Sequence, residues 1–332
     1  MIVVTGSAGF IGSAFLWKLN EMGHDDILLV DEFETGDKWK NTVKRQFTNI
    51  IHKNDFFHNL STDESTASAV TAVVHMGACS STTERDVDYL IKNNIHYSMD
   101  LFKFCAERNI PYIYASSAAT YGNGELGYSD DPTMIPSLKP INAYGWSKQV
   151  MDEWALKQKK TPPYWAGLKF FNVYGPNEYH KGHMMSLVCK SVPQIKEQGF
   201  LKLFKSYKEG IGHGEQKRDF VYIKDIIEVM YYLLDQALKG NKKVESGIFN
   251  LGCGEARSFA DLGRAAFNAM GIEPKFEWIE MPESIRNQYQ YFTEASLDNL
   301  RSKTGYDKKF HTLEEGVTDY VKNYLLAEDN YL

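Results

Sequence analysis

The sequence has little of what marks membrane or nucleic-acid-binding proteins. No apolar run is long enough to cross a bilayer, and no charged segment followed by an apolar stretch precedes the first predicted strand. The net charge is −6 and there is no long basic run, so nothing indicates a nucleic-acid footprint. We therefore expect a cytoplasmic protein that acts on neither membranes nor nucleic acids.

Metal sites and disulfides are not indicated either. The four cysteines, Cys79, Cys105, Cys189 and Cys253, are scattered without a C-x-x-C pair, and the nine histidines show no spacing of metal ligands. We expect reduced thiols, mostly buried, and no bound metal. The sequence also has no internal repeat and no low-complexity segment.

The first informative motif lies at the N-terminal end of the sequence. Ile2, Val3 and Val4 form a short β-branched run, followed by glycines at three-residue steps, Gly6, Gly9 and Gly12. Apolar residues then recur at helical spacing until Gly23, and a second apolar run over 27–30 ends at Asp31. Strand, glycine turn, helix, strand and terminal acid in this order predict a dinucleotide site: glycines admit a pyrophosphate, and the acid accepts a ribose hydroxyl.

The alternation of strands and helices continues along the chain. Apolar runs over 72–75 and 112–115 read as buried parallel strands separated by a helix, and each run is followed by small polar residues. This favours an α/β fold, a Rossmann-type doubly wound parallel sheet with a smaller C-terminal α/β lobe. With 332 residues we expect two lobes. They are a dinucleotide-binding domain over 1–170 and a mainly substrate-binding lobe over 171–332, with segments near 220–250 returning to the first domain.

Hydroxyls follow the second of these strands. Ser116, Ser117 and Thr120 stand where ligands bind in such sheets, so we expect them to face cofactor or substrate. Ordinary turn chemistry is the alternative for each one.

Tyr144 and Lys148 are four residues apart and share one helix face. A Tyr pKa of about 10 must fall by roughly 3 units, about 4 kcal/mol, before the phenol is a useful base near neutral pH. The Lys148 ammonium together with an oxidised nicotinamide ring is expected to supply that lowering.

These motifs resemble a known family. The glycine turn, the Ser-rich strand end, Tyr144-x-x-x-Lys148 and the run Phe171-Asn172-Val173-Tyr174-Gly175-Pro176 look like the extended short-chain dehydrogenase/reductase enzymes that act on nucleotide sugars, nearly end to end. Within that family, the stretches 77–84, 114–122, 180–182 and 217–222 are most similar to the epimerases of ADP-linked glycero-manno-heptose, which serve lipopolysaccharide synthesis.

The resemblance implies a mechanism. Hydride leaves C6″ of the heptose for a bound nicotinamide, the transient ketone rotates in the pocket, and the hydride returns to its other face. Two proton-transfer groups are then needed, and the resemblance assigns Tyr144 and Lys181 to these roles, with Lys148, Ser116 and Ser117 completing the catalytic set. Lys181 pairing with a substrate phosphate is the alternative.

The resemblance also implies the binding residues. Those for the cofactor are Gly6, Gly9, Phe10, Ile11, Gly12, Asp31, Glu32, Lys38, Lys53, Met76, Gly77, Ala78, Cys79, Ser80, Asn93, Tyr144, Lys148 and Val173. Those for the sugar nucleotide are Ser80, Ser116, Thr120, Asn172, His183, Lys190, Phe204, Arg218 and Tyr289. For Arg218, pairing with Asp219 or Asp225 is the structural alternative.

The chain departs from the heptose epimerases at three of these positions. Glu32 replaces Asn, and two carboxylates near the ribose repel a 2′-phosphate, so NAD is a possible cofactor. Lys38 and Lys53 attract a 2′-phosphate, so NADP remains the preferred prediction. His183 and Lys190 stand where those enzymes carry Ser and His, which leaves the sugar open. The family forms homo-oligomers, commonly pentamers, and we expect a homo-oligomer here.

Three other functions occur on similar scaffolds. Nucleotide-sugar 4,6-dehydratases carry an Asp-Glu pair where this chain has Ala118 and Ala119, so no acid can expel water. The UDP-galactose 4-epimerase type shares the hydride chemistry but lacks the stretches 77–84 and 180–182. A non-catalytic dinucleotide sensor usually loses the Tyr or the Lys, both of which are kept here.

The second half of the sequence predicts further helices and strands. We expect helices over 184–197 and 225–238, strands over 220–222 and 248–251, and a helix capped by Ser258. The glycine- and lysine-rich stretch over 205–217 is expected to be a mobile loop and a lid over the sugar nucleotide.

Overall fold

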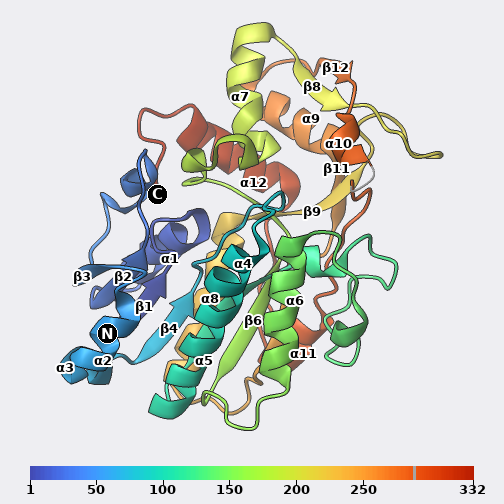
Figure 1. Cartoon of the computed structure of the whole chain (residues 1–332). Coiled ribbons are helices and arrows are strands. Elements are labelled where there is room, and N and C mark those ends of the chain that lie inside the picture. Colours follow the sequence, from blue (N-terminus) through green and yellow to red (C-terminus); the bar gives the residue numbers. More distant parts are fainter. Residues whose placement is uncertain (287–288) are drawn as a thin grey trace.

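Seven parallel strands form the central sheet of the protein, whose computed structural model describes residues 1–286 and 289–332 (Figure 1). The strand order is β10-β6-β5-β4-β1-β2-β3. The strands are β1 (Ile2–Thr5), β2 (Ile27–Asp31), β3 (Asn49–His52), β4 (Ala72–His75), β5 (Tyr112–Ser117), β6 (Trp165–Phe170) and β10 (Gly247–Leu251). Except for the exposed edge strand β3, their residues are almost all buried, because helices cover both faces.

Two apolar cores lie on the two faces of this sheet. Val4 and Phe15 belong to one core with α1 (Phe10–Glu21) and α8 (Ile223–Leu238), which pack together. Val3 and Phe102 belong to the other, with α5 (Tyr97–Arg108) and α6 (Ala143–Leu156) (Figure 1). Adjacent strand residues point to opposite faces of the sheet, so one short apolar run contributes side chains to both cores. The remaining helices near the sheet are α2 (Phe56–Thr62), α3 (Glu64–Ala69), α4 (Val87–Leu90) and α11 (Asp298–Thr304).

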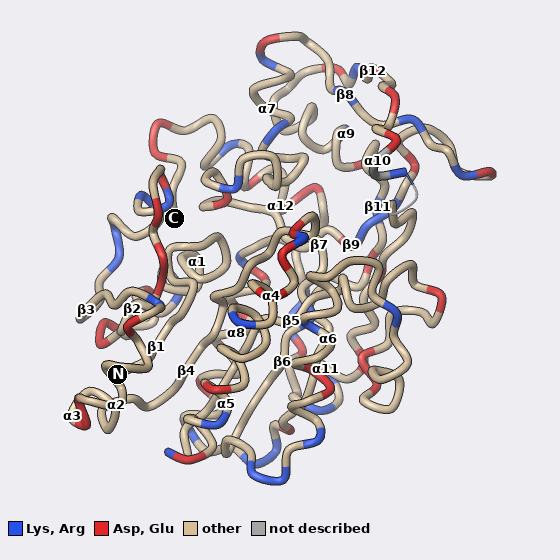
Figure 2. Tube along the Cα trace, viewed as in Figure 1, with Lys and Arg blue, Asp and Glu red and all other residues tan. Residues whose placement is uncertain are grey.

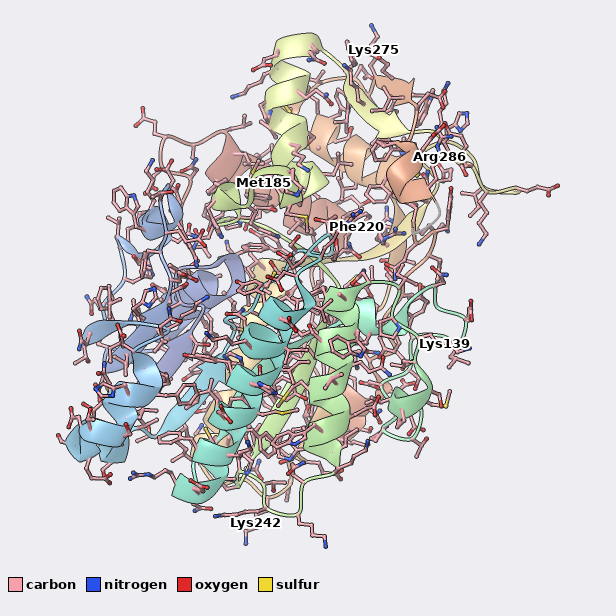
Figure 3. All side chains as sticks on the ribbon, viewed as in Figure 1. Lys139, Met185, Phe220, Lys242, Lys275 and Arg286 are labelled. Atoms are coloured by element: carbon pink, nitrogen blue, oxygen red, sulfur yellow. The ribbon has the colours of Figure 1, made fainter. Side chains whose placement is uncertain are left out.

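A smaller part of the molecule sits above the carboxyl ends of the strands. It holds a three-stranded sheet, β11-β9-β7, and a two-stranded one, β12-β8. Its elements are β7 (Asn172–Tyr174), β8 (Leu201–Phe204), β9 (Lys217–Tyr222), β11 (Ala256–Ser258), β12 (Phe276–Ile279), α7 (Leu187–Gln198), α9 (Phe259–Met270), α10 (Glu283–Arg286) and α12 (Leu313–Tyr320). Figure 3 shows Met185 and Phe220 where this part meets the large sheet, whereas Lys242 marks the opposite end.

The predicted doubly wound parallel sheet with a smaller α/β lobe is confirmed. β10 pairs with β6 at the sheet edge, and α9 begins at the Ser258 cap. The division into domains at 170 stays a prediction.

The helix expected over 184–197 begins later. A short 3-10 helix spans Tyr179–Met184, the backbone of Gly182 takes a φ of 54°, and α7 starts at Leu187. The break has a local cause, since a left-handed Gly cannot continue a right-handed helix and the Ser186 hydroxyl caps the N–H of Cys189 at 3.2 Å.

All four cysteines are free thiols, but only Cys105 and Cys189 are buried, so the expectation of mostly buried thiols holds for half of them. Across residues 1–286 and 289–332, no helix is long and apolar enough to span a bilayer, and no cluster of His, Cys, Asp and Glu could hold a metal ion. Figure 2 shows basic and acidic residues interspersed along the trace.

Candidate active site

The glycine turn between β1 and α1 is tightly packed. Gly6 has a φ of +63°, and a Cβ there would lie 2.5 Å from the backbone nitrogen of Gly77. A Cβ on Gly12 would lie 2.0 Å from the carbonyl oxygen of Gly6. Gly9 is the N-cap of α1 and no side chain caps that end. The free N–H groups and the positive end of the helix dipole therefore face a space that only glycines leave open, which suits a pyrophosphate.

Gly12→Ala tests this cradle. We expect the Cβ to push the turn open and weaken dinucleotide binding at least ten-fold, because the clash is with backbone atoms that cannot rotate away. Isothermal titration of the variant with NADP and NAD measures the effect. Gly247→Ala is the matched control, since a Cβ there meets its nearest neighbour at 3.6 Å, an ordinary contact. Equal affinities in the two variants would contradict a phosphate site at the turn.

Two carboxylates and two lysines surround the end of β2. Asp31 is buried and accepts hydrogen bonds from the N–H of Ala8 and from the N–H of Glu32, both at 2.7 Å. Lys38 pairs with Asp31 at 2.5 Å, and Lys53 pairs with Glu32, whose pKa falls below its usual range as a result. Two positive and two negative side chains thus meet where a ribose would lie.

One cavity of about 500 Å³ runs from this ribose end to the ends of β4 and β5. It brings together all five predicted catalytic residues and all the predicted cofactor residues except Cys79. Its walls also include ten residues that were not predicted: Thr5, Val30, Glu34, Tyr89, Tyr97, Ala115, Phe170, Phe171, His180 and Met184. Most of these are direct sequence neighbours of predicted residues, and that adjacency was the only signal that could have found them.

Tyr144 and Lys148 enter the cavity from α6, whose N-terminus is capped by Asn142 at 2.8 Å from the N–H of Gly145. The Lys148 ammonium is buried and donates to the carbonyl oxygen of Ala115 at 2.8 Å. Burial lowers the pKa of Lys148 to about 8. In the protein alone, burial raises the pKa of Tyr144, and the Ser117 hydroxyl offsets only part of the rise, so the expected lowering by Lys148 together with an oxidised nicotinamide stays a prediction.

The strand-end hydroxyls divide into two groups. Ser117 lines the cavity and acts to lower the pKa of Tyr144, while its hydroxyl accepts a hydrogen bond from the N–H of Ala119 at 3.1 Å. Ser116 lines the cavity, but its hydroxyl donates to Asp152 at 2.6 Å. Thr120 is fully buried and donates to the carbonyl oxygen of Ser117 at 2.9 Å. The expectation that its hydroxyl faces cofactor or substrate is therefore wrong, because the short helix after β5 turns it inward.

Lys181 enters the cavity from the smaller part of the molecule. Its ammonium lies 5.0 Å from the centre of the Phe10 ring. Burial and the nearby Lys190 lower the pKa of Lys181, whereas the buried carboxylate of Glu178 acts in the opposite direction. The lowering has the direction expected of a lysine that exchanges protons, and that role of Lys181 stays a prediction.

Most residues predicted for the sugar nucleotide lie outside this cavity: Thr120, Asn172, His183, Lys190, Phe204, Arg218 and Tyr289. The structure brings Arg218 within 5.1 Å of the Tyr289 ring, and Lys190 donates to the carbonyl oxygen of His183 at 2.6 Å. The Arg218 fork donates to the carbonyl oxygens of Lys217 and Gln290. Within the described residues it has no ion pair with Asp219 or Asp225, so that structural alternative is wrong.

Comparisons with known proteins agree with this site. The chain matches the NAD dependent epimerase/dehydratase family over residues 2–252. It belongs to that family. A relative from Fusobacterium nucleatum, an ADP-L-glycero-D-manno-heptose-6-epimerase, is 54% identical over 340 residues, covering 100% of both chains. An equally named relative from Nitratidesulfovibrio vulgaris (strain Hildenborough) is 51% identical, again over 100% of both chains.

Solved structures place the fold in the same epimerase/dehydratase family. The crystal structure of ADP-L-glycero-D-manno-heptose-6-epimerase from Helicobacter pylori has a TM-score of 0.76 and 27% identity, covering 97% of this chain and 95% of that one. MoeE5 in complex with UDP-glucose and NAD has a TM-score of 0.72 at 20% identity, covering 97% of each chain, which supports the fold alone.

Proposed function

We propose that this family member is an ADP-glyceromanno-heptose 6-epimerase, which interconverts the D-glycero and L-glycero forms of ADP-β-D-manno-heptose. One observation carries the proposal: Tyr144 and Lys181, two groups able to exchange protons, line the same cavity as the glycine cradle. Full-length relatives of that name at 51–54% identity support the choice of sugar.

The cofactor is a nicotinamide dinucleotide, and the cavity fits it. The glycine turn would hold the pyrophosphate, Asp31 and its neighbours the adenosine ribose, and Lys148 the ribose next to the nicotinamide. When bound, the nicotinamide supplies an acceptor and donor of hydride.

The protein's own side chains then move protons. Tyr144 takes the proton of the C6″ hydroxyl of one epimer and returns it in the reverse direction, while the Ser117 hydroxyl orients the phenol. Lys181 serves the hydroxyl of the other epimer, since in that epimer the proton leaves from the opposite side of the carbon. Because the cavity alone raises the pKa of Tyr144, an oxidised nicotinamide would supply the positive charge that lowers it.

We propose NADP as the preferred form, with Glu32 limiting the preference. Lys38 and Lys53 both line the ribose end of the cavity, and a 2′-phosphate is the group that would need two cations there. Binding then requires Lys53 to exchange Glu32 for the phosphate.

Glu32→Asn is expected to tighten NADP binding about five- to ten-fold. A carboxylate at about 4 Å costs roughly 4 kcal/mol per unit charge at an effective dielectric of about 20, and solvent around the Glu32 side chain, which is 34% exposed, reduces this to about 1 kcal/mol. Competitive titration of NADP against NAD measures the change. Unchanged NADP affinity would mean that Glu32 does not face the 2′-position. Glu34→Gln, which removes another carboxylate from the same cavity, is the control.

For the substrate, we propose that Arg218 meets the diphosphate bidentately and that Tyr289 covers it, which requires Arg218 to release the carbonyl oxygen of Gln290. The stretch over 205–217 as a lid also stays a proposal. We further propose that the enzyme works in the cytoplasm and as a homo-oligomer such as a pentamer, which light scattering after size-exclusion chromatography tests.

An isotope experiment tests the reaction type. Epimerisation in D₂O should leave the C6″ hydrogen of the product undeuterated, since the abstracted hydride returns without exchange with solvent. Proton NMR of the product reports this directly. Deuterium at C6″ would mean that a proton is removed and returned instead, and would contradict the hydride mechanism.

A further inference from the structure

Behind Tyr144 lies a buried ion pair whose two residues do not line the cavity. Tyr144, Lys148 and Asp152 recur every four residues on α6, so they share one face of that helix. The Asp152 carboxylate and the Lys169 ammonium of β6 are 2.6 Å apart, and both side chains are fully buried. Neither residue lines the cavity.

The Asp152 carboxylate is held by two further donors, both from β5. The Tyr114 hydroxyl donates to one oxygen at 2.9 Å, and the Ser116 hydroxyl donates to the other at 2.6 Å. Asp152 thus fastens α6 to the strand that ends in Ser117, the partner of Tyr144.

Lys169 reaches the same strand end by another route. Its ammonium donates to the Thr120 hydroxyl at 2.8 Å, and that hydroxyl donates to the carbonyl oxygen of Ser117 at 2.9 Å. The pair therefore holds Ser117 from two sides, through the preceding residue of β5 and through its own carbonyl group.

Stability alone does not account for such a pair. Replacing a buried ion pair by well-packed apolar residues is often neutral or stabilising, because desolvation offsets the attraction between the charges. β6 is otherwise built of apolar residues and Gly167, so Lys169 is an exception on a strand whose packing would favour an apolar side chain.

We propose that Asp152 and Lys169 are positioning residues for Tyr144: they fix the face of α6 that carries the base against Ser117, and each opposes the field that the other exerts on the phenol. The inference rests on the proposed role of Tyr144 as the base.

The surrounding charges agree with this role. Asp152 acts to raise the pKa of Tyr144 and that of Lys148, and so does the partly exposed thiol of Cys79. His75, which lies near Lys148, stays neutral because burial lowers its pKa to about 3. Of the two acidic groups that raise the pKa of Tyr144, Asp152 and Cys79, only Asp152 has a buried counter-ion within the described residues.

Removing the charge of Asp152 and removing the charge of Lys169 should therefore have opposite effects on the pKa of Tyr144. Asp152→Asn leaves the Lys169 cation uncompensated and should lower the pKa of Tyr144, whereas Lys169→Met leaves the Asp152 anion uncompensated and should raise it. A unit charge about 10 Å away at an effective dielectric of about 20 moves a pKa by roughly one unit. The double variant Asp152→Asn/Lys169→Met should return close to the wild-type value.

The measurement is an NMR titration of enzyme carrying ¹³Cζ-labelled tyrosine, saturated with NADP, with the Tyr144 signal assigned from Tyr144→Phe. Tyr114→Phe is the matched control: it removes one hydrogen bond from Asp152 without changing any charge, and should leave the Tyr144 pKa unaltered. Where epimerisation is measured, the pH profile of kcat should shift with the same signs while KM stays within two-fold.

Equal Tyr144 pKa values in wild type and Asp152→Asn, or shifts of the same sign in both single variants, would overturn the proposal. If Lys169→Met does not fold by circular dichroism, Asp152→Asn compared with Tyr114→Phe decides alone. The titration needs no sugar, so its outcome is separate from whether the enzyme accepts ADP-heptose.

Discussion

Replacing Tyr144 by Phe is expected to lower kcat for epimerisation about a thousand-fold while the fold stays intact. Positioned proton transfer contributes roughly 10² to 10⁴ in rate, and the phenol is the only hydroxyl that α6 places in the cavity beside Ser117. The ring is kept, so packing and dinucleotide binding should change little. A loss in kcat with an almost unchanged KM is the signature of an interaction that acts in the transition state.

Tyr164→Phe is the matched control for this variant. The Tyr164 hydroxyl is buried and has no hydrogen-bond partner among the described residues, so its removal should leave kcat within two-fold. Discontinuous NMR assays of the C6″ configuration measure both variants. A Tyr144→Phe enzyme within three-fold of wild type would remove Tyr144 from the mechanism.

Lys181→Met is expected to lower kcat about a hundred- to a thousand-fold, and the double variant Tyr144→Phe/Lys181→Met should have no measurable activity. Methionine keeps an unbranched apolar side chain of similar size but cannot carry a proton. Since each residue serves a different epimer, neither single variant should be able to complete the cycle efficiently in either direction.

The control for Lys181 is Lys196→Met, which removes an exposed lysine from α7. If Lys181 instead pairs with a substrate phosphate, Lys181→Met should raise KM and leave kcat near wild type. Steady-state kinetics over a range of ADP-heptose concentrations separates the two roles. Full activity in the double variant would exclude both residues as proton-transfer groups.

The parts of the site that local spacing determines could be predicted from the sequence. Gly6, Gly12 and Asp31 lie on one strand-turn-helix-strand unit, whose geometry is set within about thirty residues. Tyr144 and Lys148 lie on one helix face for the same reason. These residues do line one cavity in the structure.

Contacts between distant segments could not be predicted. Lys169 and Asp152 meet because α6 packs against β5 and β6 pairs with that strand, and nothing in either segment alone indicates the partner. The inward turn of Thr120 and the position of Tyr289 over Arg218 have the same origin. The raised pKa of Tyr144 could not be predicted from the sequence either, because the burial that raises it depends on the whole fold.

The most direct test of the account is to incubate the purified protein, without added nicotinamide, with ADP-D-glycero-β-D-manno-heptose and to follow the C6″ configuration by NMR. Mass spectrometry of the denatured sample identifies any dinucleotide that copurifies. If the protein is the proposed epimerase, the D-glycero substrate is converted to a mixture with the L-glycero epimer, and the bound cofactor is recycled in place. No conversion after addition of NADP and of NAD, by a protein that binds either dinucleotide, would contradict it and turn the search to UDP-hexoses.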